Sequence, residues 1–330
     1  QETSVIDVAS GVEVLEYYAG IAQSLQGSHI DLPPEAFAIM RREPLGVCAA
    51  IGAWNYPIQI ALWKSAPALA CGNTMVFKPS EITPLTALKL AEIYKEAGLP
   101  DGVFNVVLGA GATGSALVAH PNVAKVSLTG SVATGKRVAA MAADTLKKVT
   151  LELGGKSPII IFDDCDKESA INAALAANFY STGQVCSNGT RVFVHDRMFD
   201  AFVDEVVDRS KAIVIGDPFH PDTQMGPLVS AQQLDKVMGY LSEARTSSNV
   251  TLLCGGDVSS GDDKEGGYFI TPAVVVAETD DHPIVTEEVF GPVMTVLKFS
   301  DEDDVLTRAN NTRLGLAAAV FSQNFSRAHR

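Results

Sequence analysis

Three residues in this sequence have types and settings that suit covalent catalysis. Cys186 lies in the glycine-framed loop Gly183–Gly189, which would give its thiolate access to a substrate and to a flat cofactor. Glu152 ends an apolar strand segment, where a carboxylate would suit a general base. Asn55 stands in a loop, where its amide could donate to a developing oxyanion. The alternatives are a core cysteine, a strand-edge glutamate turned to water and an asparagine that caps a turn.

Two glycine-rich turns are candidate phosphate sites. Gly109–Gly114 is a G-x-G-x-x-G sequence after the predicted strand Phe104–Val107, and such a turn admits a pyrophosphate at a helix start. A tight turn without a ligand explains this sequence about as well. Gly130–Lys136 nearly matches a P-loop, but Arg137 replaces the Ser or Thr that binds magnesium, which argues against an NTPase. It remains a candidate phosphate-contacting turn.

The segment Lys78–Glu81 directly follows the predicted strand Thr74–Phe77. Ligands of parallel sheets bind beyond the carboxyl ends of the strands. The carboxylate of Glu81 could accept both hydroxyls of an adenosine ribose and would repel a 2′-phosphate, which favours NAD over NADP. A solvated turn is the alternative interpretation.

Composition excludes several classes of function. The 330 residues, 47% of them hydrophobic, suffice for two domains. A net charge of −14 disfavours nucleic acid and anionic membranes, and no apolar run approaches the roughly 18 residues of a membrane span. No signal peptide is recognised. Five cysteines without a C-x-x-C motif, and scattered histidines, predict no disulfide framework and no metal site, and favour the cytoplasm.

Apolar strand patterns alternate with helical ones, which predicts an α/β architecture with parallel sheets. A domain boundary is expected at Leu153–Gly155, and Gln26–Pro44 reads as a projecting hairpin or arm. Helices are expected over Thr83–Ala97, with Thr83 as cap, over Lys167–Phe179 and over Arg197–Ala212. The remaining expected strands are Val47–Ile51, Lys125–Leu128, Val149–Leu151, Ile159–Phe162, Arg191–Val194, Thr251–Cys254, Ala273–Val276, Val293–Lys298 and Ala317–Phe321.

Seven motifs in order make the sequence resemble the aldehyde dehydrogenase superfamily, most closely its betaine aldehyde and 4-trimethylaminobutyraldehyde dehydrogenase branch. The resemblance implies a Rossmann-like NAD-binding domain over residues 1–153, with part of an oligomerisation arm at 26–44, and an α/β catalytic domain over 154–330. The motifs are Trp54–Pro57, Gly72–Thr74, Lys78–Glu81, Thr129–Ser131, Leu151–Lys156, Gly183–Cys186 and Glu288–Pro292.

The same resemblance assigns roles to residues. Cys186 is then the nucleophile, Glu152 the base and Asn55 the side-chain half of the oxyanion hole. Glu288 would hold the nicotinamide ribose and Phe290 would pack beside the nicotinamide ring. The full implied NAD-binding set is Trp54, Lys78, Ser80, Glu81, Gly111, Gly130, Ser131, Thr134, Leu153, Gly154, Glu288 and Phe290.

The implied activity is NAD-dependent oxidation of an aldehyde to a carboxylic acid through a thioester on Cys186. Attack by the thiolate creates the oxyanion from which hydride can leave, and hydrolysis of the thioester then needs an activated water. Three aromatic residues, Tyr56, Trp63 and Tyr180, suit a trimethylammonium aldehyde through cation–π attraction, with Tyr56 and Trp63 on one helix face. A general hydrophobic tunnel for aliphatic aldehydes or semialdehydes is the alternative.

The resemblance also implies a homo-oligomer, either a dimer or a homotetramer. Family members extend beyond both ends of this sequence, so the first part of the cofactor domain and the end of the catalytic domain are expected to be missing. An inactive fragment or a non-catalytic structural relative is therefore one alternative. An NADP-preferring or CoA-acylating enzyme is another, which Glu81 and Glu152 disfavour.

Overall fold

The computed structural model of the chain describes residues 3–260 and 266–330. It contains two compact units, Gln1–Leu153 and Gly154–Arg330, which are described separately here. Within the described ranges, no helix combines the length and the apolar character that crossing a membrane requires.

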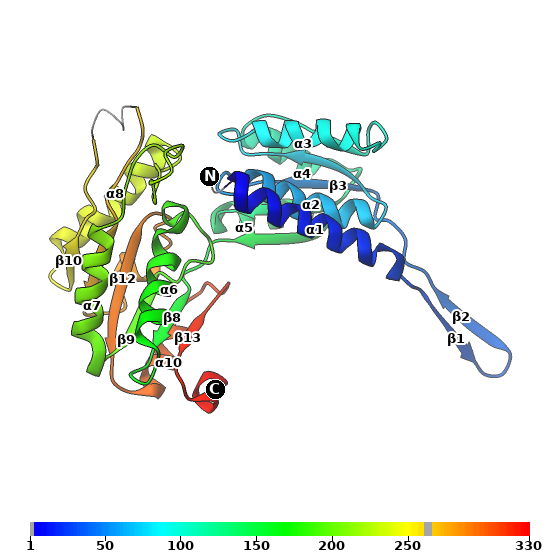
Figure 1. The fold of residues 1–330 in the computed structure, drawn as a ribbon. Helices are drawn as coiled ribbons and strands as arrows, with labels where there is room; N and C mark the ends of the chain where they lie inside the picture. The colour runs from blue at the N-terminus through cyan, green and yellow to red at the C-terminus, as the bar shows by residue number, and fades with distance from the viewer. Residues whose placement is uncertain (1–2, 261–265) are drawn as a thin grey trace. The chain divides into compact units, whose positions relative to one another are not determined.

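The first unit is built on a five-stranded parallel sheet in the order β5-β4-β3-β6-β7 (Figure 1). Its strands are β3 (Val47–Ile51), β4 (Thr74–Lys78), β5 (Phe104–Val106), β6 (Val123–Gly130) and β7 (Lys148–Leu153). The chain moves outward from β3 to β5 and then returns to the other side of β3. Such a reversal is the topological switch point where doubly wound sheets bind ligands.

Helices cover both faces of this sheet. One apolar cluster joins the sheet to α2 and α3, and the other joins it to α4 and α5. The helical segments are a π-turn at Thr3–Asp7, α1 (Val8–Ile21), a 3-10 turn at Ala22–Ser24, α2 (Pro57–Ala70), α3 (Leu85–Glu96), α4 (Gly111–Ala119) and α5 (Val132–Ala143).

A two-stranded antiparallel hairpin extends from this unit beyond α1 (Figure 1). Its strands are β1 (Ser28–Leu32) and β2 (Ala36–Met40), so the expectation of a hairpin within Gln26–Pro44 is confirmed. The side chains of both strands are exposed or nearly so, and many are apolar.

The second unit holds a six-stranded sheet in the order β10-β11-β12-β9-β8-β13, parallel except for β10 against β11. Its strands are almost continuous apolar runs, as expected for a sheet that is buried on both faces. They are β8 (Pro158–Ile161), β9 (Arg191–His195), β10 (Val250–Cys254), β11 (Ala273–Ala277), β12 (Val293–Phe299) and β13 (Ala319–Phe321).

Helices also cover both faces of the second sheet. One core cluster contains side chains of α6 and α7, and the other contains side chains of α8, α9 and α10. The helical segments are α6 (Lys167–Phe179), a 3-10 turn at Tyr180–Gly183, α7 (Asp196–Lys211), α8 (Ala231–Thr246), α9 (Pro283–Thr286), α10 (Glu302–Asn310) and α11 (Phe325–Ala328).

One local expectation is wrong. The helix α3 begins at Leu85, its N-cap residue is Pro84, and no side chain caps it. Thr83 donates its backbone N–H to the carbonyl of Ser80, so it belongs to the preceding turn and lies too early in the chain to cap the helix. Its buried hydroxyl has no hydrogen-bond partner among the described residues.

Candidate active site

The predicted NAD-binding segments of the first unit meet at one edge of its sheet. The strand register pairs Ile51 with Lys78 and with Leu128, and pairs Gly130 with Leu153. Since all five strands are parallel, the segments that follow them emerge at the same carboxyl edge. This edge contains the switch point between β3 and β6, which is where a doubly wound sheet binds a dinucleotide.

Lys78 ends β4 and is almost fully buried. Its ammonium donates to the carbonyl of Pro79 at 2.8 Å and lies 3.6 Å from the exposed carboxylate of Glu81. Ser80 is buried, and its hydroxyl accepts from the backbone N–H of Ile82. The turn therefore presents one cation and one carboxylate side by side, a pair that can bind the two hydroxyls of a ribose.

The three glycines of the turn before α4 and its first residues have different steric surroundings. A side chain on Gly109 would clash with Thr113, whereas one on Gly111 would meet open space. Gly111 is exposed and is the first residue of α4. Gly114 packs at ordinary contact distance on the aliphatic chain of Lys78. The motif thus brings α4 against the Lys78 turn, and steric crowding explains only Gly109 among its three glycines.

The turn before α5 has the geometry of an anion site. Ser131 is the N-cap residue, and its hydroxyl accepts from the backbone N–H of Thr134 at 3.2 Å. The same hydroxyl lies 3.0 Å from the hydroxyl of Thr134, and Gly130 precedes it at the end of β6. A helix N-terminus with two hydroxyls attracts a phosphate through its orphan N–H groups and its dipole.

Glu152 lies in β7, the last strand of the sheet, and its side chain is exposed. Of the two interpretations left open for Glu152, a carboxylate inside an apolar strand end and a strand-edge glutamate turned to water, this exposure agrees with the second within this unit. Leu153 points the other way and packs closely on Gly135 of α5. This alternation is the ordinary period of a strand.

Lys64 is a member of this site that the sequence pattern did not reveal. It is buried in α2, and its ammonium donates to the hydroxyl of Ser127 at 2.9 Å. Burial lowers the pKa of Lys64 to about 8, and the carboxylate of Glu152 acts in the opposite direction. A single lysine within the otherwise largely apolar helical segment Ile60–Ala70 was the signal that could have identified it.

The segment Trp54–Tyr56 follows β3 at the same edge and is half-buried. The helix α2 begins at Pro57, so Tyr56 lies outside the helix with a φ of −132°. The helix on which the expected common face of Tyr56 and Trp63 depended is confirmed. Tyr56 is its N-cap residue, and Trp63 lies on α2 and is 46% exposed, so a common face of the two rings stays a prediction. Their separation along the helix does not decide whether both rings meet one substrate.

In the second unit, hydrogen bonds of the residues just before Cys186 hold the loop that carries it. Ser181 and Thr182 both have a φ above +50°, and Thr182 donates its hydroxyl to the carbonyl of Gly226. The side chain of Gln184 donates to Ser181 and accepts from the backbone of Val229. Cys186 is partly accessible, while the neighbouring 3-10 turn begins at Tyr180, which is 41% exposed.

Three glycines bring the predicted catalytic and cofactor loops of this unit together. A side chain on Gly154 would clash with the carboxylate of Glu288, and a Cβ on Gly155 would lie 2.7 Å from the carbonyl of Cys186. Gly183, with a φ of +69°, packs directly on the carbonyl of Gly291. The strand-end glycines, the Cys186 loop and the Glu288 loop (residues 283–291) therefore form one contiguous surface.

Glu288 is the most unusual carboxylate of this surface. Its Oε1 atom is buried and has no hydrogen-bond partner within the described part of the chain. Burial raises the pKa of Glu288, and Lys236 and a hydrogen bond from the backbone of Gly155 oppose that rise. Phe290 has a φ of +59°, a strained value for a non-glycine residue, and its carbonyl accepts from Gln233 at 2.7 Å. A buried oxygen without a partner can accept from a ligand hydroxyl.

The other cysteines have less suitable settings. Burial raises the pKa of Cys48, Cys165 and Cys254, which keeps these thiols protonated and unreactive. Cys71 is exposed and is the C-cap residue of α2 in the first unit. Within the described ranges, no group of three or more His, Cys, Asp or Glu residues could hold a metal ion.

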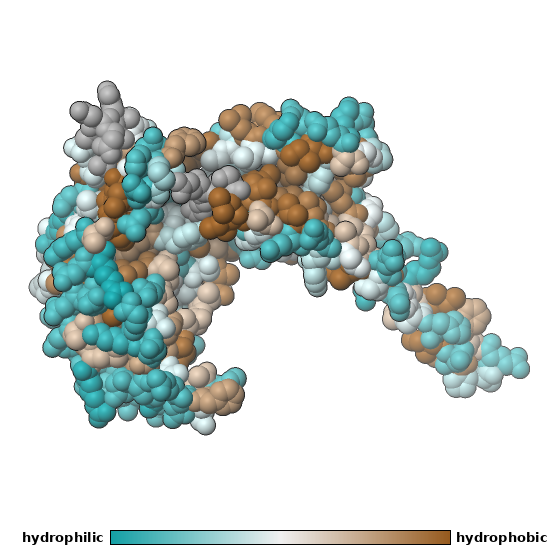
Figure 2. All heavy atoms as spheres, viewed as in Figure 1, coloured by the Kyte–Doolittle hydropathy of each residue, from teal (hydrophilic) through white to brown (hydrophobic). Residues whose placement is uncertain are grey.

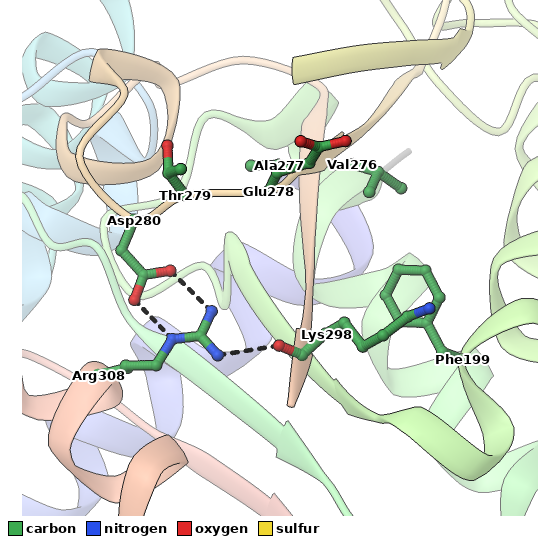
Figure 3. Close-up of a pocket in the computed structure, with 8 residues that line it drawn as sticks. All are labelled: Phe199, Val276, Ala277, Glu278, Thr279, Asp280, Lys298 and Arg308. Atoms are coloured by element: carbon green, nitrogen blue, oxygen red, sulfur yellow. Dashed lines mark hydrogen bonds and ion pairs between the residues drawn. The ribbon is translucent and has the colours of Figure 1, made fainter. Parts of the chain in front are cut away.

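A separate concavity of the second unit, with a volume of about 530 Å³, includes none of the predicted residues (Figure 3). Its charges are largely paired with one another. Arg308 binds Asp280 through two hydrogen bonds, and the ammonium of Lys298 lies 4.4 Å from the centre of the Phe199 ring. The remaining lining residues are Val276, Ala277, Glu278 and Thr279. We assign no function to it.

The comparisons with known proteins agree with one another. A model of the aldehyde dehydrogenase family matches residues 1–330. The chain is 59% identical to a betaine aldehyde dehydrogenase of Brucella anthropi and 56% identical to one of Vibrio vulnificus. Both alignments cover 100% of this chain, and 67% and 68% of those proteins.

Solved structures give the same result. The NAD+ complex of an aldehyde dehydrogenase from Bacillus cereus matches with a TM-score of 0.95 and 43% identity. A betaine aldehyde dehydrogenase of Staphylococcus aureus in complex with NAD+ matches with a TM-score of 0.96 and 42% identity. Each match covers 98% of this chain and 65% of the other, so the chain spans about two thirds of the length of its relatives. From the match along its whole length and from these identities, we conclude that the chain belongs to the aldehyde dehydrogenase family.

Proposed function

We propose that the protein oxidises an aldehyde to a carboxylic acid with NAD as the oxidant, and that betaine aldehyde is its substrate. The observation that carries the proposal is the contiguous surface of the second unit, where Gly154 and Gly155 contact both the Glu288 carboxylate and the Cys186 loop. A nucleophile beside a cofactor-binding carboxylate is what this reaction requires. Family membership supports the same reaction.

The residues fit NAD in each unit. In the first unit, the carboxyl edge offers a helix N-terminus at Ser131 for the pyrophosphate, and the adjacent charges of Lys78 and Glu81 for a ribose. In the second unit, the unpaired buried Oε1 of Glu288 is suited to a ribose hydroxyl. Thr134, Leu153, Gly154 and Phe290 would flank the cofactor.

The chemistry begins at Cys186. Its thiolate attacks the aldehyde carbon, so a C–S bond forms and the carbonyl oxygen becomes an oxyanion. The side-chain amide of Asn55 and the backbone N–H of Cys186 would donate to this oxyanion. When NAD is bound, it accepts the hydride that the collapsing oxyanion expels. Cys186 then carries a thioester.

Glu152 completes the cycle as a general base. Its exposed carboxylate takes a proton from water, and the resulting hydroxide attacks the thioester carbon. The carboxylic acid leaves and the thiolate of Cys186 is restored. The ammonium of Lys64 lies close enough for the charge of Glu152 to oppose the lowering of the lysine's pKa.

The assignment of betaine aldehyde rests on the relatives and on aromatic side chains. The Brucella and Vibrio relatives named above are betaine aldehyde dehydrogenases. Trp63 and Tyr180 both present exposed ring surface, and Tyr56 is half-buried. Aromatic faces attract a trimethylammonium group by roughly 0.5–2 kcal/mol per ring, without any competing hydrogen bond.

A comparison of substrates tests the proposal. We expect kcat/KM for betaine aldehyde to exceed that of 3,3-dimethylbutanal, its uncharged carbon isostere, by about tenfold or more with NAD. Trp63→Ala should reduce this ratio. The matched variant Leu146→Ala should not, because it removes an exposed apolar side chain that precedes the start of β7 and not one at the carboxyl edge of the sheet. NADP should be used less efficiently, because Glu81 would repel its 2′-phosphate.

Two results would contradict different parts of the proposal. Equal kcat/KM values for the charged and uncharged aldehydes would contradict the assignment of betaine aldehyde as the substrate. They would indicate a broad aliphatic specificity instead. Absence of any NAD-dependent oxidation across a panel of aldehydes would contradict the proposed activity itself. It would favour a non-catalytic relative of the family. Acyl transfer to coenzyme A in place of hydrolysis would remove the role of Glu152.

We also infer that the protein works as a homo-oligomer, a dimer or a tetramer, in the cytoplasm. The exposed apolar side chains of the β1–β2 hairpin support an interface there (Figure 2). Within the described residues none of the five cysteines forms a disulfide, as is usual in a reducing compartment.

A further inference from the structure

Lys156 is a fully buried cation for which the proposed reaction has no use. It directly follows Gly154 and Gly155, and it is among the largest completely enclosed side chains of the chain. Its ammonium donates to the backbone carbonyl of Ile284 at 2.8 Å. Enclosing an ammonium group is strongly unfavourable unless partners compensate. A residue that only filled space would therefore be more stable as methionine or leucine than as lysine.

The partner of Lys156 belongs to the Glu288 loop. Ile284 lies in α9, at the start of that loop, and its carbonyl also accepts from the buried hydroxyl of Thr295 at 3.4 Å. Four residues later, the carboxylate of Glu288 accepts from the backbone N–H of Gly155. Two consecutive residues, Gly155 and Lys156, therefore hold the same loop at two points.

The charged groups around Lys156 lie on β9, on α8 and on the Glu288 loop. Arg191 of β9 and Lys236 of α8 are cations, while Glu287 and Glu288 of the Glu288 loop are carboxylates. Burial and the two cations lower the pKa of Lys156 to about 7, and the carboxylates oppose this. The positive charge of Lys156 in turn opposes the rise in the pKa of Glu288 that burial causes. The two side chains are thus electrostatically coupled as well as mechanically linked.

We propose that Lys156 is a positioning residue of the cofactor site: by anchoring the carbonyl of Ile284, it sets where the Glu288 carboxylate stands against Gly154 and Gly155. This inference rests on the proposed binding of a ribose of NAD by Glu288. Lys156 touches neither cofactor nor substrate in this assignment. Its effect passes through the loop 283–291, which also carries Phe290.

The first experiment needs no cofactor. Amide hydrogen exchange is measured on the intact, cofactor-free protein, comparing wild type with Lys156→Met, which keeps the length of the side chain and removes its charge and its donor. We expect faster exchange confined to residues 283–291. The matched control is Lys167→Met, an exposed lysine of α6 in the same unit, which should leave exchange in this loop unchanged.

The second experiment measures cofactor binding directly. The dissociation constant of NADH, followed by its fluorescence, should rise roughly tenfold in Lys156→Met, as expected for loss of a hydrogen bond from a charged donor. KM for NAD should rise by a similar factor, while kcat at saturating NAD changes much less. A merely structural lysine would instead lower the melting temperature of the protein and leave both constants unchanged.

The outcomes separate this inference from the proposed function. Exchange in residues 283–291 and an NADH dissociation constant that both match wild type within twofold would overturn the role of Lys156. Failure of wild type itself to bind NADH would overturn the proposed function, and the exchange comparison would still decide whether Lys156 holds the loop. If Lys156→Met does not fold, Lys156→Gln serves instead: its shorter side chain draws the N–H donor back from the carbonyl of Ile284 and removes the charge, so faster exchange in residues 283–291 is again expected.

Discussion

At the scale of single residues, accessibility distinguishes the proposed nucleophile from the other cysteines. Cys186 is partly accessible, and its carbonyl is packed against Gly155. The other partly accessible thiol of the second unit, that of Cys165, has its pKa raised by burial and by the neighbouring Asp164. A thiol that stays protonated is a weak nucleophile.

Cys186→Ala should lower kcat for aldehyde oxidation by roughly four orders of magnitude or more, because no other side chain of the loop can form the covalent intermediate. The dissociation constant of NADH should stay within about twofold of wild type. Steady-state assays and NADH fluorescence measure the two quantities. Cys71→Ala is the matched control, and loss of activity in that variant together with near-normal turnover of Cys186→Ala would reverse the assignment.

Glu152→Gln should uncouple the two halves of the reaction. The variant can still form the thioester and release NADH, but the neutral amide cannot take a proton from water. Stopped-flow absorbance at the NADH band should therefore show a burst of about one equivalent per site, followed by a steady rate at least about a hundredfold below wild type. Steady turnover without a burst would be incompatible with this role.

At the scale of elements, the helix α2 places a buried cation near Glu152, the proposed general base. Its buried face carries Lys64 towards β6, where the ammonium meets the hydroxyl of Ser127. The apolar neighbours of Lys64 on that helix desolvate it, which lowers its pKa to about 8. The same packing that holds α2 on the sheet therefore creates a titrating cation close to Glu152.

The stability of the protein should consequently depend on Lys64 between about pH 8 and pH 10.5. In this window the unfolded chain binds a proton at Lys64 that the folded chain has released, so the free energy of unfolding rises with pH. Below pH 8 both states carry the charge, and folding must bury it. Lys64→Met removes this cost. The excess of its free energy of unfolding over that of wild type should therefore shrink by up to about 3 kcal/mol from pH 7.5 to pH 10.

Urea unfolding of both proteins at the two pH values measures the effect. Lys95→Met, which changes a lysine exposed on α3, is the control and should show no such pH-dependent gap. A constant difference between Lys64→Met and wild type at both pH values would show that Lys64 is not desolvated.

At the scale of the whole molecule, the β1–β2 hairpin exposes several large apolar side chains (Figure 2). Phe37 and Ile39 are 64% and 60% exposed and point to the same side of β2. A two-stranded ribbon alone is only marginally stable in water. Both facts favour burial of the hairpin against another copy of the protein.

The double variant Phe37→Ser/Ile39→Ser should therefore shift the protein towards smaller species. Sedimentation velocity should show at least about a tenfold weaker association, because two large apolar side chains lose roughly 1.5–3 kcal/mol of burial each. Phe219→Ser, which changes a phenylalanine that is 88% exposed in the second unit, is the control. An unchanged sedimentation profile of the double variant would exclude the hairpin as an interface.

Much of the secondary structure could be predicted because it depends on local patterns. The apolar run Val47–Ile51 forms β3 with the same bounds, and Lys167–Phe179 forms α6 with the same bounds. Turn chemistry was less reliable, as Thr83 shows: which residue caps a helix depends on where the preceding turn closes. Motif order was sufficient to recognise the family, because seven matches in the same order would hardly arise by chance.

By itself, then, the sequence determined the parallel α/β architecture, the hairpin, the family and the chemical groups available to the site. Only the tertiary structure decided the surroundings of those groups. The exposure of Glu152 depends on which elements cover the face of β7 to which it points, and such covering is a non-local property. The burial of Lys64 and Lys156, and the unpaired oxygen of Glu288, depend on packing between segments distant in the chain. Local patterns carry no record of such contacts, because desolvation is produced by the neighbours that folding brings together.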